Sequence, residues 1–195
     1  MSSFKQLPGT LFLIGCLMTS SALAQQQQPQ IPWGENLVKN GSFEQGNGAY
    51  YITRHDRTRI DLDVVYRGLH ALRLEGGNNE PKKDHTIVVQ GFKLSLQAGA
   101  QVLYRMAYRC ENADEKYPAS LGLVYKVEGE KKDHHIKLDK PLLVKKDCDW
   151  TVYEVVLKDL PADATLLGFN VKVPRESAAT LWIDDIQVRT YTPSK

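Results

Sequence analysis

The sequence of 195 residues has little of what marks a specialised class of protein. Lysine and arginine together number 25 and aspartate and glutamate 23, so the formal charge is only +2. Dedicated nucleic-acid-binding domains usually carry a basic excess, so no nucleic-acid partner is expected. With 42% hydrophobic and 25% charged residues, the composition is that of an ordinary globular protein and excludes a disordered or fibrous chain.

Long apolar runs are also missing. The strongest run is Leu11–Met18, which follows Lys5 and precedes Ala22-Leu23-Ala24. A transmembrane helix needs about 20 apolar residues, whereas a weakly basic start, a short apolar core and an Ala-x-Ala site are typical of a signal peptide. We therefore expect residues 1–24 to be a signal peptide, no transmembrane segment, and a secreted or periplasmic protein.

The same segment has a second interpretation. Leu13-Ile14-Gly15-Cys16 resembles a bacterial lipobox, in which Cys16 would carry a lipid anchor. The apolar pair Leu17-Met18 favours simple export, because lipoproteins usually continue with polar residues after the cysteine. Residues 25–35, rich in glutamine and proline, are expected to form a flexible leader.

Cysteine is scarce: only Cys110 and Cys148 remain once the signal peptide is removed. An even pair in an oxidising compartment favours a disulfide between them. Such a bond would stabilise the fold by about 3–4 kcal/mol in the chain-entropy model. Two free, buried thiols are the alternative, and two cysteines do not form a zinc site by themselves.

No helical periodicity longer than two turns is present, and two-residue alternation takes its place. In Val102–Arg109, Val102, Tyr104, Met106 and Tyr108 share one face, and Leu103, Arg105, Ala107 and Arg109 the other. Further strands are expected over residues 50–53, 61–66, 71–74, 86–92, 121–127, 150–157, 165–173 and 180–189. Many short strands separated by turns predict an all-β protein, a two-sheet antiparallel sandwich over residues 36–190, with 191–195 as a C-terminal tail.

Four segments occur in an order that is typical of one group of sandwich domains. They are Asn36–Glu44, Gly68–Leu74, Trp150–Leu157 and Leu181–Val188. Together they resemble the jelly-roll carbohydrate-binding modules of families 4, 9 and 22, which have a galactose-binding-like fold. The resemblance implies a jelly-roll β-sandwich that binds a poly- or oligosaccharide without catalysing a reaction.

Carboxylates near both ends of this domain are expected to meet. Asp184 alternates with apolar residues, and a carboxylate on an inward row is costly unless it is paired. The resembling modules hold a structural calcium here, which implies Glu44, Asp184 or Asp185, and the backbone carbonyl near Gly68, as oxygen ligands. The alternative is that Asp184 or Asp185 only accepts backbone hydrogen bonds at a bulge.

Polar side chains on several strands are candidates for binding a glycan. They are Arg105, Arg109, Lys126, Asn170 and Lys172. Gathered on one sheet face they would suit an acidic polysaccharide, because arginine pairs with carboxylates in a bidentate manner. An ordinary solvated face is the alternative.

Aromatic candidates come from the segment that often lines the binding edge in the resembling modules, where sugar rings stack on aromatic side chains. They are Tyr50, Tyr51 and Tyr66. Two other classes of function stay open. One is a cell-surface or envelope interaction domain without sugar specificity, and the other is a small secreted polysaccharide lyase or hydrolase.

Overall fold

The computed structural model describes residues 31–193, apart from 78–84, 95, 98 and 159. The predicted signal peptide, the Cys16 lipid site, the first part of the leader and the end of the tail lie outside the described residues. Among the described residues, no helix is long and apolar enough to cross a membrane.

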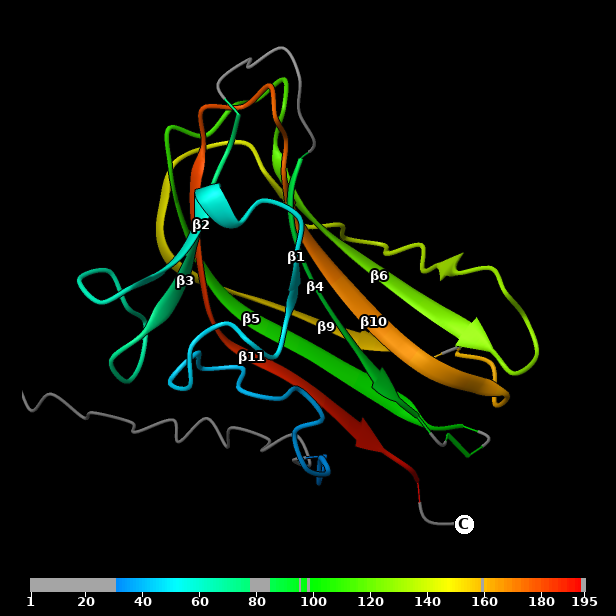
Figure 1. Cartoon of the computed structure of the whole chain (residues 1–195). Coiled ribbons are helices and arrows are strands. Elements are labelled where there is room, and N and C mark those ends of the chain that lie inside the picture. The colour runs from blue at the N-terminus through cyan, green and yellow to red at the C-terminus, as the bar shows by residue number, and fades with distance from the viewer. Residues whose placement is uncertain (1–30, 78–84, 95, 98, 159, 194–195) are drawn as a thin grey trace, which may run out of the picture. The chain divides into compact units, whose positions relative to one another are not determined.

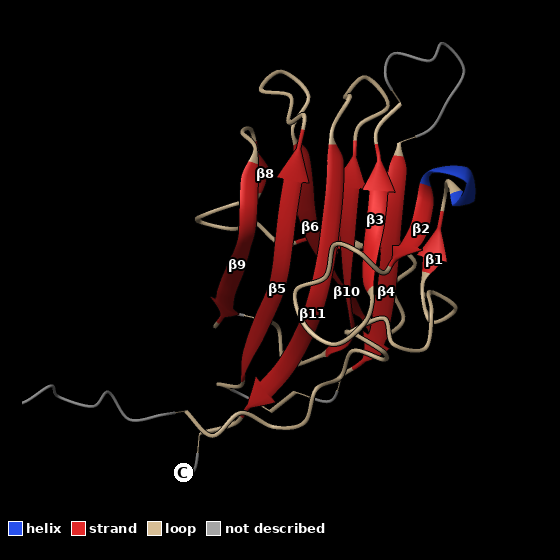
Figure 2. Ribbon diagram, turned by 90° about the vertical axis from the view of Figure 1, so that its left-hand side faces the viewer, coloured by secondary structure: helices blue, strands red, loops and turns tan. Residues whose placement is uncertain are grey.

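Two antiparallel sheets pack face to face as two layers of strands (Figures 1 and 2). Sheet A consists, in spatial order, of β1 (Tyr51–Ile52), β4 (Thr86–Lys93), β10 (Ala164–Val173), β6 (Ala119–Val127) and β7 (His134–His135), with β8 (Leu143–Val144) also paired to β6. Sheet B consists of β2 (Thr58–Asp61), β3 (Ala71–Glu75), β11 (Thr180–Tyr191), β5 (Gln101–Glu111) and β9 (Cys148–Leu157). A 3-10 turn, η1 (His55–Arg57), precedes β2. The predicted all-β two-sheet sandwich is confirmed.

The core lies between the two sheets, where the inward rows of the long strands meet. In β5, Val102, Tyr104 and Met106 are fully buried, as the alternation predicted. Phe43 is also fully buried, and its ring stacks on Tyr50 with the centroids 5.0 Å apart. Apolar burial of this kind is the main favourable term in folding, and it fixes which face of each strand is left for solvent or ligand.

The end of the predicted leader is attached to the last strand. The Gly34 N–H donates to the Thr190 carbonyl at 2.8 Å. Trp33 lies edge-on to Tyr191, with 6.1 Å between ring centroids. Tyr191, the first residue of the predicted tail, is the last residue of β11.

The strand predicted over residues 61–66 is wrong, because β2 ends at Asp61. The Asp61 carboxylate accepts the N–H groups of Asp63 and Val64 at 3.0 and 3.1 Å. Such local hydrogen bonds compete with strand pairing and favour a turn. Residues 62–70 instead form a loop, here called the β2–β3 loop, over the outer face of sheet B.

Asp184 lies on the outer row of β11 and not on the predicted inward row. The register of β11 against β5 shifts between Asp184 and Gln187, and Asp185 has a left-handed φ of 47°. One extra residue at such a bulge reverses the side on which the following residues point. Ile186 therefore enters the core, while Asp184 pairs with Ala107 beneath the β2–β3 loop.

Candidate functional site

The predicted ligand-binding side chains are divided between the two sheets. Those on the outer face of sheet A are Tyr51, Lys126, Asn170 and Lys172. Those on or above the outer face of sheet B are Arg105, Arg109 and Tyr66. The expectation that the arginines and lysines share one face is wrong, because β5 and β6 belong to different sheets whose outer faces point in opposite directions.

Tyr50 belongs to the core, so its predicted role in stacking on a ligand is wrong. Only 8% of the residue is exposed, and its hydroxyl donates to the Asn40 carbonyl at 3.1 Å. Burial also raises the pKa of this phenol. Its neighbour Tyr51 points to the opposite side of β1 and is 70% exposed.

On sheet B, Arg109 is engaged by the protein itself. Its guanidinium pairs with Glu111 at 2.7 Å and lies 5.5 Å from the centroid of the Trp182 ring. Arg73 lies over the same ring at 5.3 Å, and the indole N–H donates to Asp61 at 2.9 Å. Trp182 is only 3% exposed, so this cation–π cluster closes the surface where a sugar would stack.

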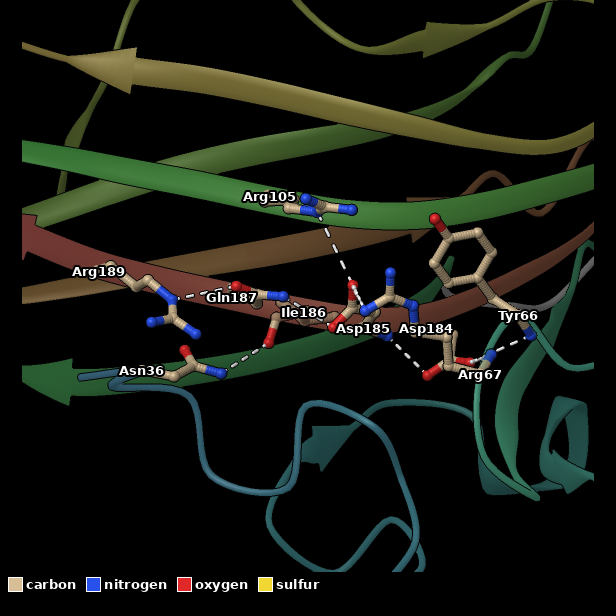
Figure 3. Close-up of polar contacts among 9 residues, drawn as sticks. All are labelled: Asn36, Tyr66, Arg67, Arg105, Asp184, Asp185, Ile186, Gln187 and Arg189. Atoms are coloured by element: carbon tan, nitrogen blue, oxygen red, sulfur yellow. Dashed lines mark hydrogen bonds and ion pairs between the residues drawn. The ribbon is translucent and has the colours of Figure 1, made fainter. Parts of the chain in front are cut away.

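Arg105 takes part in a second polar cluster on sheet B, drawn in Figure 3. Arg105 and Arg67 lie 3.8 and 4.0 Å from the same carboxylate oxygen of Asp185. The other Asp185 oxygen accepts from the Gln187 amide at 2.8 Å, and Gln187 accepts from Arg189 at 3.0 Å. Both arginines singled out in the sequence therefore have partners within the fold.

Glu44 anchors the end of the β2–β3 loop. One carboxylate oxygen accepts the N–H groups of Leu69 and His70 at 2.8 and 3.3 Å, and the other lies 2.8 Å from the His70 ring. The Leu69 N–H, followed by the His70 side chain, lowers the pKa of Glu44. Gly68 has a φ of 71°, and a Cβ there would collide with Glu44, so the contact needs glycine.

Replacing Glu44 with glutamine should lower the melting temperature at neutral pH, because the amide cannot accept all three donors. A group whose pKa is lowered by folding stabilises above its unfolded pKa and loses that contribution as the pH falls through its folded pKa. The difference between wild type and Glu44→Gln should therefore shrink in acid. Melting curves along a pH series measure it, and a difference that does not change with pH would contradict this role.

Asp184 holds the middle of the same loop (Figure 3). One oxygen accepts the N–H groups of Tyr66 and Arg67 at 3.2 and 2.9 Å, and the other accepts that of Asp185 at 2.6 Å. The residue is fully buried, and burial raises its pKa while the three N–H groups oppose the shift. The buried carboxylate thus accepts backbone N–H groups with both of its oxygens and joins the loop to the bulge.

This arrangement does not fit a calcium ion, since N–H donors face the oxygens of Glu44 and Asp184 that calcium would need. Within the described ranges, no group of three or more histidine, cysteine or acidic side chains is placed to hold a metal. The contacts match the alternative in which an aspartate accepts backbone hydrogen bonds at a bulge. Calcium binding by Glu44, Asp184, Asp185 and the Gly68 carbonyl stays a prediction from the resemblance.

A calcium titration tests that prediction directly. A ligand bound only by the native state raises its stability, so a calcium site would raise the melting temperature in calcium over that in a chelator. From the donor geometry we expect equal melting curves in the two buffers. A higher melting temperature in calcium, abolished by Glu44→Gln, would show that the carboxylates rearrange around the ion.

Cys110 and Cys148 face one another across β5 and β9 as register partners. Both thiols are free, so the predicted disulfide is not formed in this structure. Burial raises the pKa of Cys110 to about 12 and also raises that of Cys148. Protonated thiols are poor nucleophiles, and the pair matches the alternative of two free thiols.

The outer face of sheet A brings an exposed ring and an amide into one row. Tyr51, Val89, Asn170 and Gly122 are successive register partners across β1, β4, β10 and β6 (Figure 1). A Cβ on Gly122 would lie within 3 Å of the Asn170 amide, so that side chain lies across the glycine. Two strand spacings of about 4.8 Å separate Tyr51 from Asn170.

The neighbouring row has almost no side chains at its centre. Gly91 on β4 pairs with Gly168 on β10, which pairs with Val124 on β6. Glycine inside a strand often marks a place where a ligand or another backbone approaches closely. Gly91, Gly168 and Gly122 are here called the glycine trough; Gly91 is exposed, whereas Gly168 is buried and the Asn170 amide lies over Gly122.

Lysines lie at both ends of the glycine trough. Lys93 and Lys126 flank Leu166 at one end, and Lys172 lies near the other, six residues further along β10, or about 20 Å of strand rise. Lys126 also pairs with Asp133 at 3.1 Å. Among the described strands of sheet A, the outward positions carry these lysines and no carboxylate, although Asp133, beside the sheet, offsets the charge of Lys126.

Several of these residues were not predicted as site residues from the sequence. They are Gly91, Gly122, Gly168 and Lys93. The available signal was glycine in the interior of three strands that otherwise alternate regularly. Without the strand order, nothing in the sequence showed that the three glycines lie together.

Comparisons with known proteins bear on the fold. The chain matches no family profile and no curated protein sequence. Among solved structures it is similar to a family 16 carbohydrate-binding module, with 18% identity, 78% of this chain and 99% of that chain covered, and a TM-score of 0.57. It is also similar to the CBM22-1 xylan-binding domain of Paenibacillus barcinonensis Xyn10C, with 16% identity, coverages of 83% and 97%, and a TM-score of 0.54.

A third similar structure is TmCBM61, solved with β-1,4-galactotriose, with 12% identity, coverages of 80% and 98%, and a TM-score of 0.53. At these identities the likeness shows the fold alone. That fold is the jelly roll of carbohydrate-binding modules, which confirms the resemblance seen in the four sequence segments.

Proposed function

We propose that this chain is an exported, noncatalytic protein that binds a polysaccharide along the outer face of sheet A. The observation that supports it best is the row formed by the exposed Tyr51 ring and the Asn170 amide beside the glycine trough. An aromatic face binds the apolar side of a sugar ring, and an amide offers both a donor and an acceptor to hydroxyl groups. Glycines let a polysaccharide approach the backbone of the sheet.

The charge of the face supports an acidic polymer as the ligand. Lys93, Lys126 and Lys172 lie along the trough, and the outward positions of the described sheet A strands hold no carboxylate. Lysine ammonium groups attract uronate carboxylates or sulfates, and such exposed pairs weaken as salt is added. The solved neighbours described as a xylan-binding domain and as a galactotriose complex support glycans as the ligand class.

A single side chain added to the trough tests this placement. Gly91 is exposed, and a Cβ there meets only ordinary contacts with Leu166 and the Leu167 carbonyl, so Gly91→Val should fold normally. The added side chain should nevertheless keep a polymer away from the sheet surface. Affinity electrophoresis should show binding to the preferred polysaccharide weakened by about tenfold or more, which corresponds to a loss of about 1.4 kcal/mol of binding free energy.

Gly48→Val is the matched control, because a Cβ at Gly48 has no neighbour within 4 Å and the residue lies outside the sheets.

The noncatalytic role is tested on the same samples: the polysaccharides are recovered after incubation and assayed for new chain ends. Equal binding by Gly91→Val and wild type would contradict the proposed face, and newly cut chains would contradict the noncatalytic role.

A further inference from the structure

A cavity of about 680 Å³ opens at the edge of the sandwich, and none of the three trough glycines lines it. Its two main walls are residues 154–158, at and just past the end of β9, and residues 135–140, from the last residue of β7 onward; Tyr125 of β6 and Leu160 complete the lining. Its volume lies within the range of about 300–1,000 Å³ that is usual for ligand sites. The Tyr153 hydroxyl donates to the Lys140 carbonyl at 2.8 Å and ties the two walls together at one end.

The cavity runs along the backbone edges of the two walls. Successive residues of a strand point to opposite faces, so a cavity lined by consecutive residues on each wall must follow the strand edge. β9 pairs with β5 on one side, and within the described chain no strand pairs with its other side. Its N–H and C=O groups on that side are therefore available to an added strand.

The apolar side chains that line the cavity suit an extended peptide in which apolar and polar residues alternate. Ile136, Leu138 and Val155 are partly buried members of the core surface, and Leu157 is buried. Apolar side chains of an added strand that point inward would bury surface against them, since apolar burial is favourable.

The rim of the cavity is basic on balance. Lys137, Lys140 and Lys158 are exposed, against Asp139 and Glu154. Three lysines against two carboxylates leave a net charge of +1 on the rim. The lysines therefore leave a positive edge toward anything that enters.

From these features we propose that the cavity, here called the β9 slot, binds an extended acidic peptide segment of a partner protein by strand addition to β9. Main-chain hydrogen bonds to the free edge would supply affinity, and alternating apolar and acidic side chains would supply specificity. This site is separate from the polysaccharide face and does not depend on it.

The test pans a phage-displayed library of random twelve-residue peptides against the full chain. We expect enriched sequences in which acidic and β-branched residues alternate. A synthetic peptide of the enriched sequence should bind the Lys137→Glu, Lys158→Glu double variant about tenfold or more weakly, because like charges across an interface are unfavourable. N-methylation of its alternate residues should abolish binding by removing main-chain donors.

Lys145→Glu, Lys146→Glu is the matched control, since both lysines are exposed and neither lines the slot. Gly91→Val should bind the peptide as wild type does, which separates this site from the polysaccharide face. Failure to enrich peptides, equal binding to the Lys137→Glu, Lys158→Glu variant, or equal binding of N-methylated peptides would overturn the proposal. A dimer of this chain formed through β9 would overturn it as well.

Discussion

Replacing Tyr51 with alanine should weaken polysaccharide binding by about 30-fold or more, which corresponds to about 2 kcal/mol. Losses of this size are typical when an aromatic anchor at the centre of a binding site is truncated. Because 70% of Tyr51 is exposed, the ring contributes little to the core, and the melting temperature should hardly change. Isothermal titration calorimetry and thermal unfolding of the same samples measure both quantities.

Leu69→Ala is the matched control for this substitution. Leu69 is also 70% exposed, but it lies on the β2–β3 loop at the other sheet. The substitution deletes a similar area of exposed apolar side chain and should leave polysaccharide binding unchanged. Wild-type affinity in Tyr51→Ala, or an equal loss in Leu69→Ala, would contradict the assignment of the binding face.

Replacing Asp184 with alanine should reduce the free energy of unfolding by about 3 kcal/mol. The carboxylate is fully buried and accepts N–H groups from Tyr66, Arg67 and Asp185. Each buried donor left without an acceptor costs about 1–3 kcal/mol, while removing a buried charge returns part of that loss. Urea denaturation followed by fluorescence measures the change.

Asp163→Ala serves as the control, since Asp163 is exposed and surface substitutions usually stay within about 0.5 kcal/mol. If Asp184 instead acted by holding a metal ion, its substitution would cost stability only in calcium. A loss seen equally in calcium and in chelator supports the hydrogen-bond role, and a loss confined to calcium would contradict it.

Strand alternation predicted the sandwich well wherever both faces of a strand are distinct. In β4, the buried Thr86, Val88 and Gln90 alternate with more exposed residues, so a regular period of two identifies the core side. Such alternation is a relation between adjacent residues, so it can be recognised in the sequence directly. The four sequence segments predicted the jelly-roll fold by their resemblance to carbohydrate-binding modules.

The sequence-based predictions failed at two kinds of position. At the first, a bulge or a local hydrogen bond interrupts the two-residue alternation of a strand. At the second, the result depends on how strands far apart in the sequence are arranged in the sheets. The bulge at Asp185 reverses the row on which Asp184 lies, and the hydrogen bonds of Asp61 end a strand that its apolar neighbours would continue. Whether Arg105 and Lys126 share a face depends on which of the two sheets β5 and β6 each belong to. That choice is made by packing between strands far apart in the sequence.

An amide NMR titration with an oligosaccharide of the preferred polymer tests the central claim most directly. The account predicts that the largest chemical-shift changes fall on Tyr51 and on the outward residues of β4, β10 and β6, centred on Gly91, Gly168 and Asn170. Resonances of Arg105, Arg109 and the β2–β3 loop should stay in place. Shifts concentrated on sheet B, or no shifts with any acidic or neutral glycan, would contradict it.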